Sequence, residues 1–233
     1  MTSLEPAGEK TRLLLACLRA YCLIGDDPTV RSVRAMKMTQ EGEFRLSPDG
    51  RWLPFTAEEV IETTRSNFRW EARFGRGIRS FAVTDAFEHG HGQLVVKAGG
   101  LLPVQNASGP EVDQGELQRY LAEIPICPPI LLNHPTLQWE AIGPLTLRVR
   151  DGHHGTTTVD LEIAGSGQPV AARADRPRRV GKQAVETPWS AVCLDFQERE
   201  GMRLPRRLEA QWHLPEAAFT YIRSEVTSIA LLR

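Results

Sequence analysis

The feature that most restricts the fold of this chain is a two-residue alternation of apolar and polar side chains. Between Met36 and Leu46, mostly apolar residues occupy the even positions, whereas lysine, threonine, glutamate and arginine occupy the odd ones. In residues 68–74, Phe68, Trp70, Ala72 and Phe74 share one side in the same way. Because successive side chains of a strand point to opposite faces, both segments predict half-buried β-strands.

Similar short segments with Gly- or Pro-rich turns between them continue to the end of the chain. Further strands are expected at 78–87, 93–104, 137–141, 145–151, 156–163, 169–174, 184–198, 207–214 and 220–231. Short strands at regular spacing indicate an antiparallel arrangement. The predicted fold class is therefore mainly β (α+β), with a large curved antiparallel sheet or partial barrel. A sheet of this size curls around a helix or encloses a cavity.

Three segments have helical patterns instead. Apolar residues recur at helical spacing in 11–23 and predict an amphipathic N-terminal helix. Residues 56–64 begin with Thr-Ala-Glu-Glu, a capping box that predicts a short helix. Residues 113–124 combine an N-cap at Asp113, an acidic residue three positions later and an apolar stripe, and Pro125 is expected to end this central helix. The N-terminal and central helices are expected to pack on the sheet.

Composition and charge exclude several classes of protein. The chain has 233 residues, of which 41% are hydrophobic and 24% charged, so we expect a flexible N-terminus (1–10) and one β-rich domain (11–233). A net charge of −1 gives no basic surface for nucleic acid. The apolar run at 13–24 contains Arg19 and is too short to cross a bilayer, so no transmembrane segment is expected. Four cysteines without CxxC spacing indicate reduced thiols and a cytoplasmic location.

Several separated segments resemble an uncharacterised bacterial family, a domain of unknown function that is often linked to membrane-spanning segments in other members. The resembling pieces lie at 38–42, 52–57, 68–70, 84–85, 90–92, 119–123, 139–140, 174–176, 187–189, Gly201 and Pro205. They include an Arg-Tyr-Leu-Ala-Glu motif on the expected central helix and a Thr-Pro-Trp segment. The resemblance implies a shared fold and a set of positions, and it implies no particular reaction.

Three acids, Asp85, Glu123 and Asp175, fall within these segments and are the candidate catalytic groups. A carboxyl group buried in an apolar cavity has a raised pKa that suits general acid or base chemistry. Tyr120 and Gln40 could supply polar contacts to a ligand in the same cavity. A structural hydrogen bond or ion pair is the alternative for each acid.

Arg119 lies four residues before Glu123 on the expected helix. The two side chains form either a surface ion pair or the polar edge of a pocket. Arg176 belongs to a basic run, which is either a solvated loop or a place where one guanidinium points inward to bind a carboxylate, sulfate or phosphate. The remaining candidate ligand contacts are indole rings that could line a cavity or simply fill the core: Trp70, Trp139 and Trp189.

Other kinds of site are not expected. His89 and His91, like His153 and His154, have no third ligand at a metal-site spacing, so neither a metal nor a cofactor is predicted. The glycine pairs at 75–77 and 165–167 lack the context of a phosphate loop and predict hairpin turns.

The sequence favours a protein with a small-molecule pocket that binds an apolar or amphipathic ligand. Two alternatives remain open. One is an enzyme without metal or cofactor, a cyclase or hydrolase of a specialised metabolite that uses carboxylate acid/base chemistry. The other is a non-catalytic subunit that binds a protein partner or forms a homodimer.

Overall fold

The computed structural model describes residues 8–25, 28–75, 80–99, 102–181 and 183–233. Its strands are β1 (Ala35–Phe44), β2 (Leu53–Glu62), β3 (Phe68–Phe74), β4 (Phe81–Glu88), β5 (His91–Ala98), β6 (Leu102–Ala107), β7 (Leu137–Ala141), β8 (Thr146–Asp151), β9 (Val159–Ile163), β10 (Pro169–Val180), β11 (Gln183–Arg199), β12 (Met202–His213) and β13 (Ala218–Leu232). The helices are α1 (Glu9–Cys22), α2 (Pro28–Arg31), α3 (Pro110–Ala122) and α4 (Ile130–Asn133), with one 3₁₀ turn, η2 (Ile124–Ile126).

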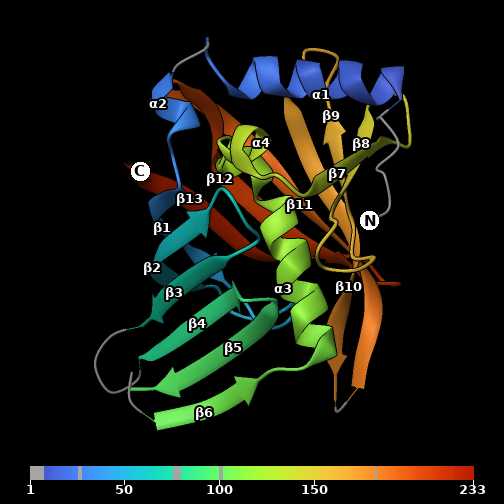
Figure 1. Ribbon diagram of the computed structural model, residues 1–233. Coiled ribbons are helices and arrows are strands. Elements are labelled where there is room, and N and C mark those ends of the chain that lie inside the picture. Colours follow the sequence, from blue (N-terminus) through green and yellow to red (C-terminus); the bar gives the residue numbers. More distant parts are fainter. Residues whose placement is uncertain (1–7, 26–27, 76–79, 100–101, 182) are drawn as a thin grey trace.

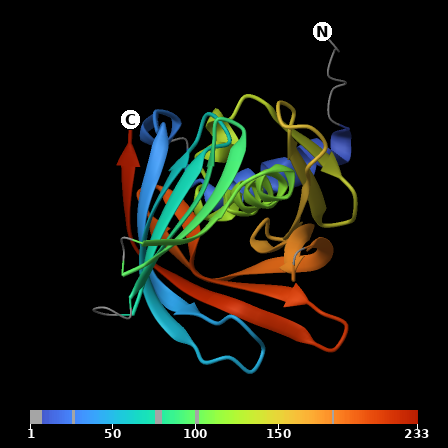
Figure 2. The same ribbon diagram turned by 90° about the horizontal axis from the view of Figure 1, so that it is seen from below.

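All thirteen strands belong to one antiparallel sheet with the order β6-β5-β4-β3-β2-β1-β13-β12-β11-β10-β9-β8-β7. Strands that follow one another in sequence are neighbours in the sheet, except β6 and β7, which form its two edges. Strands β1 and β13 pair although they are far apart in the sequence. The sheet therefore consists of two meanders, β1 to β6 and β7 to β13, joined along β1 and β13. It curves strongly, as Figure 2 shows, and the predicted mainly β fold with a curved antiparallel sheet is confirmed.

The helices cover only part of the concave face. Helix α3 connects the two meanders and runs from β6 up toward α4 inside the curve of the sheet, while α1 crosses the upper end (Figure 1). Leu18 of α1, Leu121 of α3 and Ile126 of η2 are almost completely buried together with Phe68 of β3, so the main core lies between the helices and the upper sheet.

The helix predicted at 56–64 is wrong, because these residues belong to β2 and the following loop. Phe55, Ala57, Glu59 and Ile61 are buried on the concave face, and the residues between them face outward. Strand β2 pairs with β1 on one side and with β3 on the other. This pairing overrides the local capping-box pattern, as tertiary context often does.

Two further boundaries differ from the sequence prediction. The central helix begins at Pro110 after Gly109, and Asp113 is not its N-cap; instead, the Asp113 carboxylate accepts a hydrogen bond from the Gly92 backbone N–H at 2.6 Å. The strand expected at 93–104 is two strands, β5 and β6. Gly99, with φ of +58°, follows β5 in the turn that separates them.

The other predicted elements are present with shifted ends. The N-terminal helix spans Glu9–Cys22, so it already includes the last two residues of the expected flexible segment; residues 1–7 lie outside the described part. The later strands occur as expected, but β10, β11 and β12 extend further as long hairpins. The expected turn at 165–167 joins β9 to β10, whereas most of the one at 75–77 lies outside the described residues.

Candidate ligand-binding site

Helix α3 is held close to the sheet at both of its flanks. A Cβ atom on Gly92 of β5 would lie 2.5 Å from the backbone oxygen of Val112, so only glycine allows this approach. On the opposite side, Gln118 donates a hydrogen bond to the backbone oxygen of Asp175 in β10 at 2.8 Å. The residues of α3 that face the sheet are therefore fixed over its concave surface.

Arg119 of α3 is the centre of a buried ion network. Its guanidinium contacts carboxylates of Glu59 at 2.9 Å, Asp85 at 2.6 Å and Glu123 at 2.8 Å. The exposed fractions of these side chains are 17% for Arg119, 0% for Glu59 and 15% for both Asp85 and Glu123. The guanidinium also stacks over the rings of Phe68 and Trp70. This arginine therefore binds strands β2, β3 and β4 to α3 through charge and stacking.

Gln40 extends the network along β1. Its amide nitrogen donates to Glu59 at 2.6 Å, and its amide oxygen accepts a hydrogen bond from the Trp70 indole at 2.9 Å. All three side chains are buried. A buried amide with both ends satisfied fixes the orientation of its partners.

A second arginine, from β10, contacts α3 one turn closer to the N-terminus of the helix than Arg119. Arg176 of β10 donates to the backbone oxygen of Gly115 at 2.6 Å, and its guanidinium is 4.6 Å from the ring centre of Trp189. Buried Glu116 interacts electrostatically with Arg176 and with Asp85. Trp189 in turn donates to the Tyr221 hydroxyl at 3.0 Å.

We name Glu59, Asp85, Glu116, Arg119, Glu123 and Arg176 the acid–arginine cluster. Burial, and then the neighbouring Glu123 carboxylate, raise the pKa of Glu59 well above its usual value. Burial and Asp85 raise the pKa of Glu116 in the same way. The neighbouring carboxyl group is thus Glu123 for Glu59 and Asp85 for Glu116, and each neighbour disfavours the ionised form of its partner.

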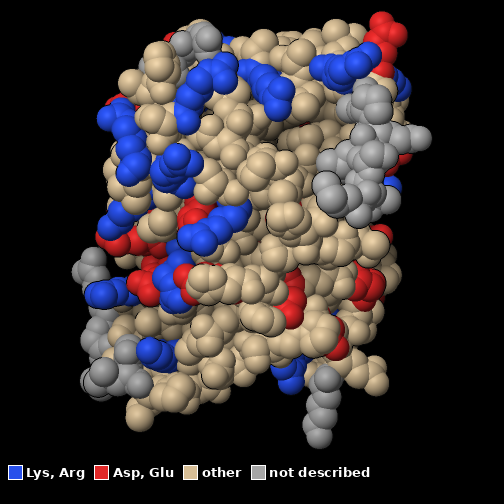
Figure 3. Space-filling model, in the orientation of Figure 1, with Lys and Arg blue, Asp and Glu red and all other residues tan. Residues whose placement is uncertain are grey.

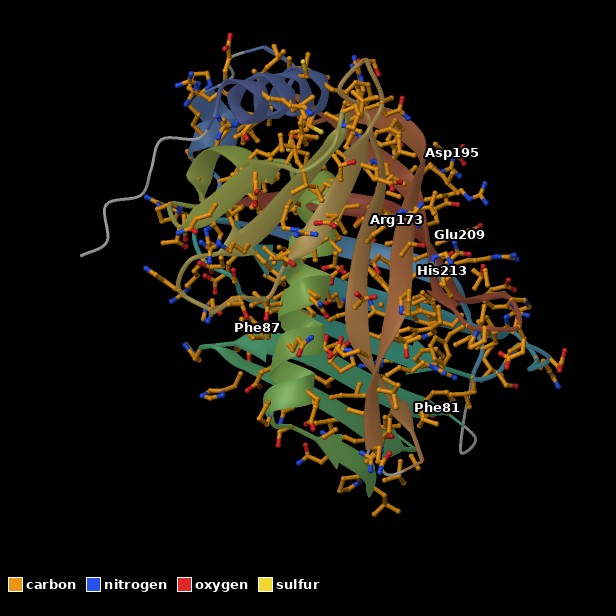
Figure 4. The ribbon with its side chains drawn as sticks, turned by 90° about the vertical axis from the view of Figure 1, so that its right-hand side faces the viewer. Phe81, Phe87, Arg173, Asp195, Glu209 and His213 are labelled. Atoms are coloured by element: carbon orange, nitrogen blue, oxygen red, sulfur yellow. The ribbon has the colours of Figure 1, made fainter. Side chains whose placement is uncertain are left out.

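Beside α3, aromatic side chains form a continuous band across the same face (Figure 4). This aromatic row takes one ring from each of seven adjacent strands, β4, β3, β2, β1, β13, β12 and β11: Phe81, Phe74, Phe55, Phe44, Tyr221, Trp212 and Trp189. Ring centres are 4.6 Å apart for Phe81 and Phe74, 5.9 Å for Phe74 and Phe44, 5.9 Å for Phe44 and Tyr221, and 5.9 Å for Tyr221 and Trp212.

The rings of the row differ in exposure. Those of Phe55, Phe74 and Trp189 are buried, whereas Phe44, Phe81, Tyr221 and Trp212 are half-buried. Figure 4 shows the two ends of β4: Phe87 lies beside α3, and Phe81 lies at the end away from the helix. The row therefore has an accessible apolar surface where none of the described helices covers the sheet.

Gly42 makes the row possible. A Cβ atom at this position would lie 2.7 Å from the Phe55 ring and closer still to the backbone oxygen of Arg223. The Phe55 ring therefore lies directly over the β1 backbone.

A groove of about 800 Å³ lies mainly on the outer face of the sheet. It reaches Phe55 of the row and includes charged side chains of β1, β3, β12 and β13. Opposite charges there contact one another, as Glu209 does with Arg207 at 3.7 Å and with Arg223 at 3.6 Å. Figure 3 shows that Lys and Arg gather near α1 and α2 on the face that carries α3. Because the charges of the outer groove satisfy one another, we place the candidate site on the concave face.

The histidines lie elsewhere. His89 and Gly90 form the β4–β5 turn, both with positive φ, and the His91 side chain is exposed. His154 lies 3.7 Å from the buried carboxylate of Asp151, which accepts hydrogen bonds from hydroxyl groups of Ser66 and Thr136. This arrangement fixes the loop after β8. The histidine pairs do not approach the acid–arginine cluster through any contact of the described residues.

The sequence matches the family of unknown function DUF6544 over residues 19–224. The chain belongs to this family. No curated protein matches the sequence. Among solved structures, a LolA superfamily protein from Nitrosomonas europaea has a TM-score of 0.52 at 9% identity, with 96% of this chain and 94% of that chain covered. A DUF1329 family protein from Desulfovibrio piger has a TM-score of 0.53 at 7% identity and the same coverage. These likenesses show a shared fold.

Two properties of this DUF6544 chain bear on its environment. None of the helices in the described residues is both long and apolar enough to cross a membrane. All four cysteines are free, and Cys22, Cys127 and Cys193 are buried. Burial raises the pKa of each of these three thiols, so none is an activated nucleophile.

Most candidate residues predicted from the sequence come together in this structure. Those in or next to the acid–arginine cluster are Gln40, Trp70, Asp85, Arg119, Glu123, Arg176 and Trp189. Three do not take part in it. Tyr120 is completely buried and donates to the Glu62 backbone oxygen at 2.9 Å. Asp175 is exposed, and Trp139 packs in β7 at the far edge of the sheet.

Sequence reasoning missed two buried acids, Glu59 and Glu116. Glu59 follows Phe55 and Ala57 on one face of an alternating segment, a pattern that marks an acid among apolar neighbours. Assigning this segment to a helix concealed the pattern. No comparable local signal exists for Glu116, because its burial depends on how α3 lies against β4 and β10.

Proposed function

We propose that this protein binds an apolar or amphipathic small molecule along the aromatic row. The observation that carries the proposal is the continuous band of rings from seven adjacent strands, four of them half-buried on a concave surface that no helix covers. Ligand sites are concave and lined mainly by apolar and aromatic groups. The acid–arginine cluster supports the proposal indirectly, because it fixes α3 and keeps the helix off the row.

The test is a titration with N-phenyl-1-naphthylamine, an uncharged apolar dye whose fluorescence rises in apolar surroundings. Trp212 contributes a half-buried ring to the row, so Trp212→Ala should weaken dye binding roughly tenfold or more, given the free energy of burying a large aromatic surface. Trp52→Ala is the matched control. The Trp52 ring is half-buried too, but it stacks against Arg45 and Arg223 outside the row.

The proposal expects the parent and Trp52→Ala to bind the dye with equal affinity, and Trp212→Ala to lose most of the binding while keeping its circular dichroism spectrum. Equal affinity of all three proteins for the dye, or absence of binding to the parent, would overturn it. Native mass spectrometry of the purified protein then gives the mass of any ligand retained from the host.

A second candidate function is acid/base catalysis by Glu123 or Asp85, in a cyclase or hydrolase that acts on the bound molecule. It is favoured by the residual exposure of Asp85, Arg119 and Glu123, which are not sealed from solvent as Glu59 is. Once a ligand is known, parent protein should convert it and Glu123→Gln or Asp85→Asn should be slower by about 10² or more. Unchanged ligand after prolonged incubation with the parent would eliminate this candidate.

A further inference from the structure

Two arginines of β10 lie at one end of the aromatic row. On the concave side of this strand, Ala174 is opposite Trp189, Arg176 is opposite Thr187, and Arg178 is opposite Val185. Trp189 is in turn opposite Trp212 on the next strand. The guanidinium of Arg176 is 4.6 Å from the Trp189 ring centre, and that of Arg178 is 6.0 Å from the Trp212 ring centre. Each of the two tryptophans at this end therefore has a cation beside it.

The two guanidinium groups still have unused donors. Arg176 is only 9% exposed and uses one terminal nitrogen for Gly115, while its Nε is buried without a hydrogen-bond partner. A buried donor without a partner is unusual in a native protein and indicates a ligand or water at that position. Arg178 is half-buried and makes no hydrogen bond or ion pair with a described residue.

The charge of Arg178 is not balanced by the neighbouring cluster. The carboxylates of Asp85 and Glu123 both contact Arg119, and neither contacts Arg178. Glu186, on the neighbouring strand, accepts a hydrogen bond from Gln114 of α3. No carboxylate of the described residues pairs with Arg178, so its guanidinium is available to an anionic ligand.

We propose that the molecule bound along the row is an anionic amphiphile. Its carboxylate or phosphate end binds Arg178, with Arg176 behind it, and its apolar chain lies across the rings from Trp212 toward Phe81. Guanidinium suits this role because its planar donor set matches both anions and its face stacks on aromatic rings. From β12 to β4 the row crosses five strand spacings, roughly 24 Å, which accommodates a long alkyl chain. The inference rests on the proposed function, since it needs a ligand on the row.

The experiment compares amphiphiles that share one chain and differ in the end group. Dodecanoate, dodecyl phosphate and dodecanol are each used below their micelle concentrations to displace N-phenyl-1-naphthylamine from the parent protein. We expect both anions to bind at least tenfold more tightly than dodecanol, because a charge-assisted hydrogen bond is formed only with them. Acetate and inorganic phosphate, tested alone, should not displace the dye, which distinguishes an amphiphile from a free anion.

The variant Arg178→Gln tests whether Arg178 binds the anionic end group. It should reduce the affinity for dodecanoate and dodecyl phosphate to that for dodecanol, and leave dodecanol binding unchanged. Arg178→Lys should retain part of the preference for anions. Arg179→Gln is the matched control, because Arg179 is the next residue of β10, is exposed, and contacts no ring of the row; it should behave as the parent does.

Equal affinity of the parent for dodecanoate and dodecanol would overturn the inference and leave the proposed function standing. So would an anion preference that persists in Arg178→Gln. If none of the three amphiphiles displaces the dye, and the dye itself does not bind, both the inference and the proposed function fail.

Discussion

The concave face has two regions that the same strands build in different ways. Under α3 the strands supply charged and polar groups, and beyond α3 they supply aromatic rings. In β1 to β4 the two contributions are always four residues apart: Gln40 and Phe44, Glu59 and Phe55, Trp70 and Phe74, Asp85 and Phe81.

Four residues are two side-chain repeats on one face of a strand, so the two regions form parallel bands roughly 13 Å apart. The charged band is closed by α3 and held together by the ion pairs of Arg119. The aromatic band is not covered by α3, and four of its seven rings are only half-buried. The comparison indicates that charged groups on a buried face can hold a helix to the sheet, while rings on the uncovered part of the same face are available for a ligand.

Removal of Arg119 should have the largest effect on the charged band. Arg119→Met retains an apolar stem over Phe68 and Trp70 but leaves three carboxyl groups without their cation. Breaking a buried ion network from one side costs about 3–5 kcal/mol, measured here as the free energy of unfolding in urea at pH 7. Arg65→Met, which removes an exposed pair with Glu62, is the control and should change stability little. Similar small losses in both variants would show that the cluster does not hold α3.

Substitution of Gly42 should have the second-largest effect, and it acts on the aromatic band. Gly42→Ala places a methyl group against the Phe55 ring and the Arg223 backbone oxygen, and overpacking of this kind costs about 1–3 kcal/mol. Dye binding should also weaken, because the row is displaced at its centre. Gly165→Ala is the control, since a Cβ at Gly165 meets no atom within 4 Å. A Gly42→Ala protein with parental stability and dye affinity would contradict the described packing.

The charged band should also make stability depend on pH. The folded-state pKa of Glu59 is raised above its ordinary value near 4.5, so its contribution is fully present below about pH 4.5 and is lost as pH rises through the folded pKa. Glu59→Gln should therefore flatten the decline of Tm between pH 5 and pH 9. Glu58→Gln, on the outer face beside Lys37, should keep the parental slope. Parallel slopes in both variants would mean that Glu59 is ionised throughout.

Sequence alone predicted much of the fold and part of the site, for identifiable physical reasons. Alternation is a local signal, so β1 and β3 were predicted with nearly their observed limits. Strand β2 was predicted as a helix, because its capping-box pattern is a competing local signal. The convergence of Asp85 and Glu123 on Arg119 agrees with their place in the resembling segments.

The aromatic row was largely missed for a different reason. Trp189 was considered as part of a cavity wall, but the adjacency of Phe44 and Tyr221 depends on β1 pairing with β13. These strands are separated by most of the chain, and no local pattern specifies their register. Whether a ring in such a sheet lies under a helix or beside it is equally non-local.

The most direct test of the central claim is to locate a bound apolar molecule. An uncharged dodecyl alcohol with a diazirine on its chain would be bound to the protein, irradiated, and mapped by peptide mass spectrometry. The account predicts labels on the half-buried rings of the row: Phe44, Phe81, Trp212 and Tyr221. Labels confined to the outer groove around Arg207 and Glu209, or to the surface of α1, would contradict it.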